Sequence, residues 1–337
     1  MALHQPQNAE KKDSPLEDLA DLLKEDLTAV NAVILEKLTS DVPLIPQIAA
    51  YLIAAGGKRI RPVLTLASAT ALGGNMERAR NLAAIVEFIH SATLLHDDVV
   101  DESAERRGKA SANEVFGNQA SVLVGDFLFS RSFQLMVDDG SLKTLRILAD
   151  ASAIIAEGEV LQLQMQGNLE TGWDTYIKMI GAKTAALFAA ACEVGAVVSD
   201  VSSDVEKAMH DYGYNLGLAF QIADDMLDYN ADKAALGKQI GDDFREGKIS
   251  APVLLAYAKA TPEEKEFWQR TISKGEQCDG DLETAQSQIE KYGVIAEGIE
   301  KAAEYSAKAQ KTLEILPPSP VKPMLEQLLT YVIERSA

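Results

Sequence analysis

Apolar residues recur every three or four positions along most of the chain, and stretches of strict apolar–polar alternation are hard to find. This spacing predicts amphipathic helices rather than strands. We therefore predict an all-α fold. The expected helices cover 46–55, 59–72, 76–101, 111–116, 119–138, 141–166, 173–198, 203–228, 250–258, 262–270, 280–310 and 322–335.

A capping sequence marks the start of a further helix near the N-terminus. Ser14-Pro15-Leu16-Glu17 places Ser at the cap, Pro at the first helical position and Glu three residues after the cap, which is the pattern of a capping box. The polar residues 1–13 are expected to form a disordered tail before this helix. Clusters of Gly, Asp, Ser and Lys predict loops at 102–110, 229–249 and 271–279.

The organisation of the chain points to one domain. It contains no repeat of the solenoid type and no Gly/Ser/Pro stretch long enough to link two domains. We expect a single all-helical domain over residues 14–337. Segments 82–95 and 184–198 are apolar on nearly every side, which predicts central helices of a large bundle.

Composition narrows the classes of function. The 337 residues include 51 acidic and 32 basic side chains, giving a net charge of −19, which disfavours a nucleic-acid partner because phosphate backbones require a basic face. Two cysteines without a CxxC pattern indicate a reducing compartment. The N-terminus lacks the apolar core of a signal peptide, and the apolar stretch 184–198 is shorter than the ~20 residues that span a bilayer. We expect a cytoplasmic protein with no transmembrane segment.

One acidic pattern occurs twice, as Asp97-Asp98-Val99-Val100-Asp101 and as Asp224-Asp225-Met226-Leu227-Asp228. On a helix, residues four apart project from the same face, so each run presents a pair of carboxylates. Carboxylates shared with substrate phosphates are typical Mg²⁺ ligands. A solvated helix end is the alternative for a single run. Both runs follow strongly apolar segments, however, where like charges resist ionising without a cation between them.

Basic residues accompany both acidic runs. A Gly-led turn entering a helix is a good cradle for an anion, and other bases stand in the loops after each run or in an apolar helix, where burying a cation is costly without a partner. Each base alone is accounted for by an exposed surface position, but together they indicate a diphosphate site. They are Lys58 and Arg61, Arg106 and Arg107, Lys183, Lys238, and Lys248.

These motifs carry a family resemblance that runs from about residue 50 to residue 255. The chain resembles the trans-isoprenyl (polyprenyl) diphosphate synthases, in particular their long-chain bacterial type (octaprenyl and decaprenyl diphosphate synthases), in the ordered segments GGKRIRP, LLHDDVVDESAERRG, GDFLFSRSF, GAKTAALF, FQIADDMLDY and GKQIGDDFREGK. The resemblance implies an isoprenoid-synthase-type helical bundle around a deep central cavity, usually a homodimer. It also implies that isopentenyl diphosphate is condensed head to tail onto an allylic diphosphate such as farnesyl or geranylgeranyl diphosphate.

The resemblance assigns roles to individual residues. Asp97, Asp101 and Asp224 are expected to bind Mg²⁺, about three ions shared with the substrate diphosphate, while Asp98, Asp225 and Asp228 are expected to act through hydrogen bonds and metal-bound water. The remaining assignments are Arg106, Lys183 and Lys238 for the allylic diphosphate, Lys58, Arg61, His90 and Arg107 for isopentenyl diphosphate, Thr184 and Gln221 at the reacting centre, and Lys248 closing the site.

His90 also fits two further roles. From the sequence alone, an ordinary core histidine is an equal possibility. Glu87 and His90 also form one Glu-x-x-His unit, but di-iron bundles require a second copy. The remaining histidines of this chain provide none.

Product length follows from helix geometry. Thr93 and Ala92 precede Asp97 by four and five residues, which is roughly 6 to 7.5 Å along the helix from the metal site. In short-chain relatives a bulky aromatic commonly blocks this position, whereas small residues leave a tunnel open. We expect a product on the order of eight to ten isoprene units, the length of a respiratory quinone tail, with Phe133 or Met136 as candidate floor residues. Simple helix packing by Ala and Thr is the alternative.

Several functions are compatible with these motifs to different degrees. A medium-chain, geranylgeranyl-type synthase would share the motifs. A terpene cyclase or squalene-type synthase is expected to lack Gly57-Lys58-x-x-Arg61 and to carry a different second metal motif. A non-catalytic subunit of a heteromeric synthase would show no turnover, and the presence of both acidic motifs argues against it.

Overall fold

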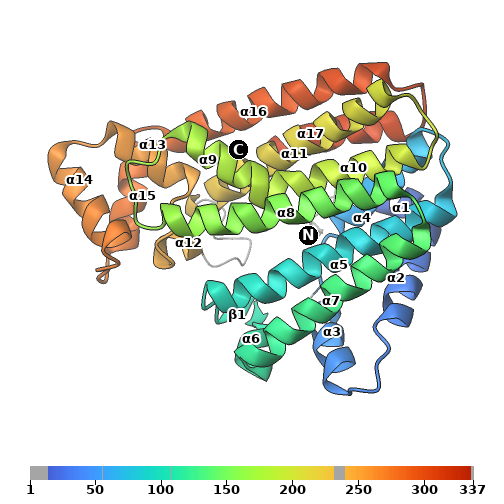
Figure 1. Ribbon diagram of the computed structural model, residues 1–337. Helices are drawn as coiled ribbons and strands as arrows, with labels where there is room; N and C mark the ends of the chain where they lie inside the picture. Colours follow the sequence, from blue (N-terminus) through green and yellow to red (C-terminus); the bar gives the residue numbers. More distant parts are fainter. Residues whose placement is uncertain (1–13, 55, 107, 231–239, 335–337) are drawn as a thin grey trace, which may run out of the picture.

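The computed structural model describes residues 14–54, 56–106, 108–230 and 240–334, and it is built almost entirely of helices (Figure 1). The prediction of an all-α fold is confirmed. The described strands, β1 (Glu105–Arg106) and β2 (Lys109–Ala110), form one small antiparallel hairpin. The expected tail over residues 1–13 lies outside the described residues.

The elements follow the sequence pattern closely. In chain order the helices are α1 (Pro15–Leu22), α2 (Lys24–Lys37), α3 (Leu44–Ala54), α4 (Ile60–Ala71), α5 (Met76–Val100), α6 (Ala112–Phe116), α7 (Asn118–Asp139), α8 (Leu142–Met165), α9 (Trp173–Ile180), η1 (Gly181–Ala185), α10 (Ala186–Val197), α11 (Ser203–Tyr229), α12 (Asp242–Arg245), α13 (Ala251–Lys259), α14 (Pro262–Trp268), η3 (Gln269–Ser273), α15 (Asp281–Lys291), α16 (Val294–Thr312), η4 (Leu313–Ile315) and α17 (Val321–Glu334).

Local chemistry determines where several helices begin and end. The predicted capping box at Ser14 is present: the Ser14 amide donates to Glu17 Oε2 at 2.9 Å, and the Glu17 amide donates to Ser14 Oγ at 3.3 Å. The expected single helix over 280–310 is wrong. α15 ends before Gly293, which has φ 62°, a conformation that glycine adopts without steric cost and that ends helices.

Two expected loops contain regular structure. The β1–β2 hairpin lies within 102–110, and the short helix α12 lies within 229–249. The third loop, 271–279, begins later than expected because η3 continues the preceding helix to Ser273. Segments this short have too few residues for a hydrophobic period to be seen in the sequence.

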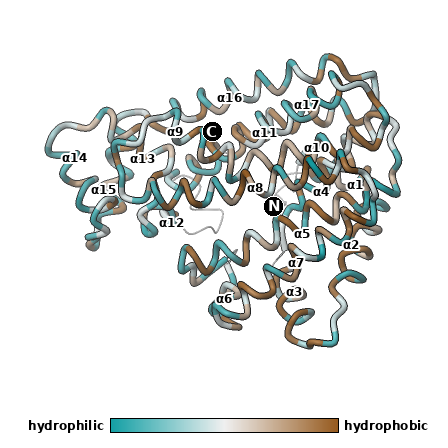
Figure 2. The backbone as a smooth tube through the Cα atoms, viewed as in Figure 1, coloured by the Kyte–Doolittle hydropathy of each residue, from teal (hydrophilic) through white to brown (hydrophobic). Residues whose placement is uncertain are grey.

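The apolar helices lie in the centre, as predicted. Residues of α4, α5 and α10 form one hydrophobic cluster, and residues of α9, α11, α13 and α16 form a second. Figure 2 shows apolar positions concentrated along these inner helices. The partly buried Tyr305 and Ile333 pack against both clusters, so the hydrophobic core is continuous from one cluster to the other.

The expected helix 173–198 contains a π-helical turn, η1, at Gly181–Ala185. A π turn rotates the residues within it relative to an α-helix and is frequent at functional sites. Gly158 on α8 lies directly against this turn, where an added Cβ would be 2.8 Å from the Lys183 amide nitrogen. The absence of a side chain at Gly158 therefore lets α8 approach the turn that carries Lys183 and Thr184.

Among the residues that the structure describes, two helical stretches are apolar and long enough to cross a bilayer, judged by length and composition. The stretch Trp173–Val197 has 83% of its most apolar window buried in the core, whereas α7 has only 39% of its window buried. Much of the exposed apolar surface of α7 and its neighbour α8 comes from Leu123, Phe133 and Val137, and from Val160 and Leu163. The stretch Trp173–Val197 is therefore part of the hydrophobic core, whereas α7 presents an exposed apolar face.

Candidate active site

A cavity of about 510 Å³ lies where the ends of α5, α8, η1 and α11 meet the α12 segment, which comprises α12 and the residues after it up to Ser250. Polar groups from each of these elements face it. Among the residues expected to take part in the chemistry, those that line it are Asp101, Lys183, Thr184, Gln221, Asp225 and Lys248. The structure therefore brings together residues that are as much as 147 positions apart in the sequence, from Asp101 to Lys248.

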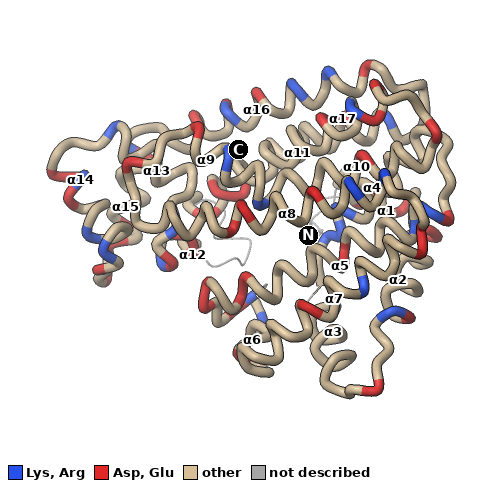
Figure 3. Tube along the Cα trace, in the orientation of Figure 1, with Lys and Arg blue, Asp and Glu red and all other residues tan. Residues whose placement is uncertain are grey.

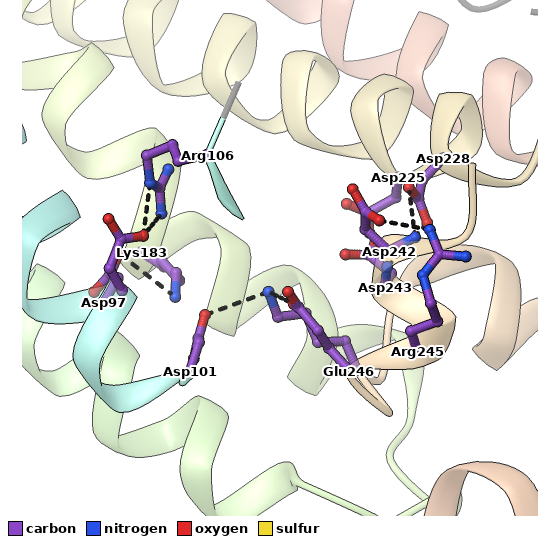
Figure 4. Close-up of polar contacts among 12 residues, drawn as sticks. Asp97, Asp101, Arg106, Lys183, Asp225, Asp228, Asp242, Asp243, Arg245 and Glu246 are labelled. Atoms are coloured by element: carbon purple, nitrogen blue, oxygen red, sulfur yellow. Dashed lines mark hydrogen bonds and ion pairs between the residues drawn. The ribbon is translucent and has the colours of Figure 1, made fainter. Parts of the chain in front are cut away.

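The first acidic run lies at the end of α5 and is paired with cations. Arg106, from β1, donates to Asp98 Oδ1 through Nε at 2.7 Å and lies 2.6 Å from it through a terminal nitrogen. Lys183 Nζ lies 3.9 Å from Asp97 Oδ2, and Lys248 Nζ lies 3.3 Å from Asp101 Oδ2. Each acid of this run therefore faces the positive group of a different element (Figure 4).

The second acidic run lies at the end of α11, on the opposite side of the same space (Figure 4). Buried Asp225 accepts three hydrogen bonds, from Tyr176 Oη at 2.6 Å, Gln221 Nε2 at 2.8 Å and the Ala251 amide at 3.0 Å. Asp228 accepts hydrogen bonds from the amides of Asp242 and Asp243 at 3.2 and 3.1 Å. These two acids are held by neutral donors.

A short polar chain links the second run to the π turn. Thr184 Oγ1 donates to Gln221 Oε1 at 2.9 Å, and the Gln221 amide nitrogen donates in turn to Asp225. This arrangement fixes which end of the Gln221 amide points toward Thr184. Both residues expected at the reacting centre therefore present oriented dipoles to the cavity.

Four acids of the site, Asp97, Asp225, Asp228 and Asp243, have raised pKa values. Burial raises the pKa of Asp97 to about 7, partly opposed by Lys183 and reinforced by Glu159 and Asp101. Burial also raises the pKa of Asp225 to about 6, although its three hydrogen bonds lower it. The pKa values of Asp228 and Asp243 are raised too, first by burial. So many carboxylates in one partly buried space favour a bound cation.

Lys248 remains a cation in this setting. Burial alone would lower its pKa, but the neighbouring Asp243, Asp101 and Glu246 outweigh this effect and raise the pKa above its ordinary value. Lys248 also forms an ion pair with Glu246. Its ammonium thus connects the α12 segment to the end of α5 across the mouth of the cavity.

The donor set fits a hard divalent cation that is shared with a ligand. Carboxylate oxygens dominate both runs, which come from the ends of α5 and α11, and Figure 3 shows acidic positions at the end of α5. One oxygen of buried Asp98 has no hydrogen-bond partner among the described residues. Within the same residues, no three His, Cys, Asp or Glu side chains are close enough to hold a metal alone. Mg²⁺ commonly uses one or two carboxylates and completes its octahedron with phosphates and water.

A second group of bases lies at the start of α4. Arg61 and His90 are 3.1 Å apart, between a terminal guanidinium nitrogen and the imidazole Nε2, and the Arg61 guanidinium lies over the Phe188 ring at 4.6 Å from its centroid. Lys58 Nζ donates to Tyr331 Oη at 3.3 Å. His90 precedes Asp97 by two helical turns on α5. The expected Arg107 and Lys238 lie outside the described residues.

The candidate chain-length residues do not line the cavity. Ala92 is fully buried in α5, Thr93 donates from Oγ1 to the His90 carbonyl at 2.8 Å, and Met136 is buried in α7. Phe133 is 45% exposed, so its role as a floor residue stays a prediction. Its place in the sequence suggested depth, but the outer face of α7 carries it to the surface.

Several residues at the site were not found from the sequence. Tyr176 supports Asp225, Glu159 pairs with Lys183 at 2.7 Å, and Asp243 and Glu246 surround Lys248. Asp243 and Glu246 lie in the sequence between Gly237-Lys238 and Gly247-Lys248. The sequence therefore showed that this segment is acidic, but not that these two acids surround Lys248. Tyr176 gave no signal, since a single Tyr in an amphipathic helix resembles any core residue.

Comparison with known proteins gives consistent matches. A family model described as Polyprenyl synthetase matches residues 42–289. The octaprenyl diphosphate synthase of Escherichia coli is 44% identical over 95% of this chain and 99% of its own length. A crystal structure of a decaprenyl diphosphate synthase from Rhodobacter capsulatus is 52% identical, with a TM-score of 0.91 over 96% of this chain and all of that chain.

One solved structure also carries ligands. The polyprenyl synthase of Caulobacter crescentus, complexed with calcium and isoprenyl diphosphate, is 48% identical and has a TM-score of 0.92 over 97% of this chain and all of that chain. A divalent cation and an isoprenyl diphosphate are thus bound together in a protein of this fold.

Proposed function

This chain belongs to the polyprenyl synthetase family, and we infer that it is a prenyltransferase that makes a long-chain trans-polyprenyl diphosphate. The observation that carries the inference is the pairing of two acidic runs across one cavity, with Lys183, Arg106 and Lys248 between or beside them. Its similarity to octaprenyl and decaprenyl diphosphate synthases supports the long-chain class. The reaction condenses isopentenyl diphosphate with an allylic diphosphate.

The allylic diphosphate is proposed to bind between the acidic runs. Asp97 and Asp101 from α5 and Asp224 from α11 are the candidate Mg²⁺ ligands, and the resemblance suggests about three ions. Bound Mg²⁺ supplies positive charge to the diphosphate and makes it a better leaving group. Lys183 lies beside Asp97, and Arg106 is paired with the adjacent Asp98, so both cations can bind diphosphate oxygens directly. Lys238 joins them in this proposal.

Breaking the allylic carbon–oxygen bond leaves a carbocation and a diphosphate. Fixed dipoles and cations aimed at developing charge are the largest source of catalysis in such sites. Thr184 and Gln221 are held in one orientation by their mutual hydrogen bond and by Asp225. We propose that their oxygens face the allylic cation, while Lys183 and Arg106 remain on the diphosphate.

Isopentenyl diphosphate is proposed to bind at the second group of bases. Arg61 of α4 and His90 of α5 are 3.1 Å apart, and Lys58, just before α4, donates to Tyr331. Arg107 is assigned to this group by the resemblance. The double bond of isopentenyl diphosphate attacks the allylic cation and forms the new carbon–carbon bond. The adjacent carbon then loses a proton to the departed diphosphate, so no side-chain base is required.

Water must be excluded while the cation exists. Lys248 connects the α12 segment to Asp101 at 3.3 Å, so this segment is placed to cover the cavity mouth. The apolar residues Met165, Met179 and Ile180 line the cavity beside the charged groups. They provide a dry surface against which a prenyl chain can lie.

We propose a product of octaprenyl to decaprenyl length, the side chain of a respiratory quinone. The support is the small side chain of Ala92 and the half-buried Thr93, one and a half turns or less from Asp97 on α5. Met136 remains a candidate for the end of the product tunnel. Assays with farnesyl and with geranylgeranyl diphosphate decide which of the two is the better primer.

A homodimer is proposed as the working form. The exposed apolar face of α7 and α8, which includes Leu123, Val137 and Val160, supports it because large uncovered apolar patches are typical of interaction surfaces. We also propose a cytoplasmic location and a single domain over residues 14–337. The burial of Trp173–Val197 in the core supports the first of these.

The test is to incubate the pure protein with radiolabelled isopentenyl diphosphate, each allylic primer and Mg²⁺, and to size the products by chromatography. Long products that disappear with a chelator are expected. Product of geranylgeranyl length would favour the medium-chain alternative, and absence of turnover would favour a non-catalytic subunit.

Chain length is tested separately by Ala92→Phe. Its ring would occupy space beside α5, and we expect products shortened by several isoprene units while the primer is still elongated. The control is Ala153→Phe, because Ala153 is exposed on α8, and it should leave the product length unchanged. A buried alanine such as Ala69 would not serve as a control. An unchanged length in Ala92→Phe would contradict the assignment.

A further inference from the structure

Glu159 on α8 makes a contact that the proposed reaction does not use. Its Oε2 accepts a hydrogen bond from Lys183 Nζ at 2.7 Å, while the same ammonium lies 3.9 Å from Asp97 Oδ2. The Glu159 side chain is only 25% exposed, and its other carboxylate oxygen has no partner among the described residues. Lys183 is therefore hydrogen-bonded to Glu159, and its ion pair with Asp97 is the longer of the two contacts.

The backbone is arranged to make this contact. Gly158 lets α8 lie directly on the η1 turn, with an added Cβ only 2.8 Å from both the Lys183 amide nitrogen and the Ala182 side chain. The next residue along α8 is Glu159, and the π turn carries Lys183. The close helix contact and the ion pair thus involve the same two neighbouring segments, which fixes the distance between the carboxylate and the ammonium.

We propose that Glu159 is a positioning residue that holds the Lys183 ammonium away from Asp97 until the allylic diphosphate arrives and replaces it. This rests on the proposed function, in which Lys183 binds that diphosphate. Because Glu159 takes the ammonium, Asp97 keeps its oxygens for a cation. A diphosphate carries more charge than one carboxylate and, with its bound metal, replaces Glu159 as the partner of Lys183.

The exchange has a cost that can be measured. The diphosphate must displace one carboxylate from Lys183 and then lie near its negative charge. Removal of that charge in Glu159→Gln should therefore strengthen binding, by about three- to tenfold, which corresponds to about 0.7 to 1.4 kcal/mol. The turnover number should fall at the same time, because the diphosphate product loses the competing carboxylate that displaces it from Lys183.

Calorimetric titration with farnesyl thiodiphosphate, a primer analogue that resists ionisation, at saturating Mg²⁺ tests this directly. The matched control is Glu157→Gln, which removes the same charge from an exposed position on the same helix and should leave affinity and turnover unchanged. Tighter binding with slower turnover in Glu159→Gln alone is the expected result. Unchanged or weaker binding in Glu159→Gln overturns the proposal, because the loss of a merely structural contact would only weaken binding. The same change in the control also overturns it.

Two further measurements keep the outcome clear. If Glu159→Gln does not fold, Glu159→Asp, with its carboxylate one methylene further from Lys183, should still bind the analogue more tightly than the wild type, and equal or weaker binding overturns the proposal. Turnover of farnesyl diphosphate is measured on the same wild-type sample. Wild-type protein that binds the analogue without elongating the primer refutes the proposed function, whereas elongation without the variant effect refutes only the role of Glu159.

Discussion

The two acidic runs have the same sequence pattern, yet their surroundings differ. On α5, Asp97, Asp98 and Asp101 face the cations Lys183, Arg106 and Lys248. On α11, Asp225 and Asp228 accept hydrogen bonds from neutral groups, including the Tyr176 hydroxyl and three backbone amides. The run on α5 is paired with long charged side chains, whereas the run on α11 is held by backbone amides and a buried tyrosine.

This difference suggests that the two acidic runs have different roles in ligand binding. An ion pair between mobile side chains can be exchanged for a diphosphate and its metal without unfolding anything, because each cation finds a new anionic partner. The donors to Asp225 cannot leave in this way, since Tyr176 is fully buried and Ala251 donates through its backbone. We interpret the α5 run as the side that rearranges on binding and the α11 run as a fixed reference.

The largest expected effect comes from removing a proposed metal ligand. Asp97→Ala should lower kcat/KM by about a thousandfold or more, because a lost ligand weakens both metal binding and the stabilisation of the leaving group. The measurement is incorporation of labelled isopentenyl diphosphate. Asp150→Ala, which changes an acid that is 58% exposed on α8, should retain wild-type activity. Near-normal activity in Asp97→Ala would rule out its role.

A smaller effect is expected on the fixed side. Tyr176→Phe keeps the ring but removes the 2.6 Å hydrogen bond to Asp225, which should lower kcat about tenfold by loosening Gln221 and should cost about 1 to 3 kcal/mol of unfolding free energy. Tyr257→Phe is the control, because Tyr257 donates to Glu170 at 3.0 Å away from the cavity. It should affect stability alone. Equal kcat values for the two variants would contradict the idea of a fixed reference.

The smallest expected effect is a pH dependence of stability. Burial raises the pKa of Asp97 to about 7 in the ligand-free protein, so between about pH 4 and pH 7 the folded state holds a proton that the unfolded chain has released. The unfolding free energy therefore decreases as the pH rises through this window. Urea unfolding of wild-type protein and Asp97→Asn, compared at several pH values without metal, should show a shallower decrease in the variant.

Added Mg²⁺ and primer analogue should reverse this trend. A bound cation requires the deprotonated carboxylate, so ligand-induced stabilisation should be greater at pH 8 than at pH 5.5. Stabilisation that is independent of pH would show that Asp97 does not contact the cation.

Much of this fold could be predicted from sequence because helical periodicity is a local property. α5, α8, α10 and α11 are long enough for their apolar faces to be recognised, and the capping box at Ser14 depends on four consecutive residues. Features set by single residues or by tertiary contacts were missed. The break at Gly293 interrupts an otherwise continuous helical pattern, and the hairpin and α12 are too short to have one.

The same limit applies to the site. The acidic and basic motifs were visible because they combine several charged residues in a short segment, and the structure brings Asp101, Lys183 and Asp225 to one cavity. Tyr176 and Glu159 act through contacts between helices that are far apart in the sequence, at 49 and 24 positions from their partners. The exposure of Phe133 could not be predicted because spacing along α7 does not tell which of its faces is inside.

We propose that both acidic runs hold one diphosphate through shared metal ions. A crystal structure of the protein with Mg²⁺ and farnesyl thiodiphosphate tests this most directly. We expect Mg²⁺ bound by Asp97, Asp101 and Asp224, with Lys183 moved from Glu159 to a diphosphate oxygen and the hydrogen bonds to Asp225 unchanged. Metal bound to only one run, or a diphosphate elsewhere, would contradict it.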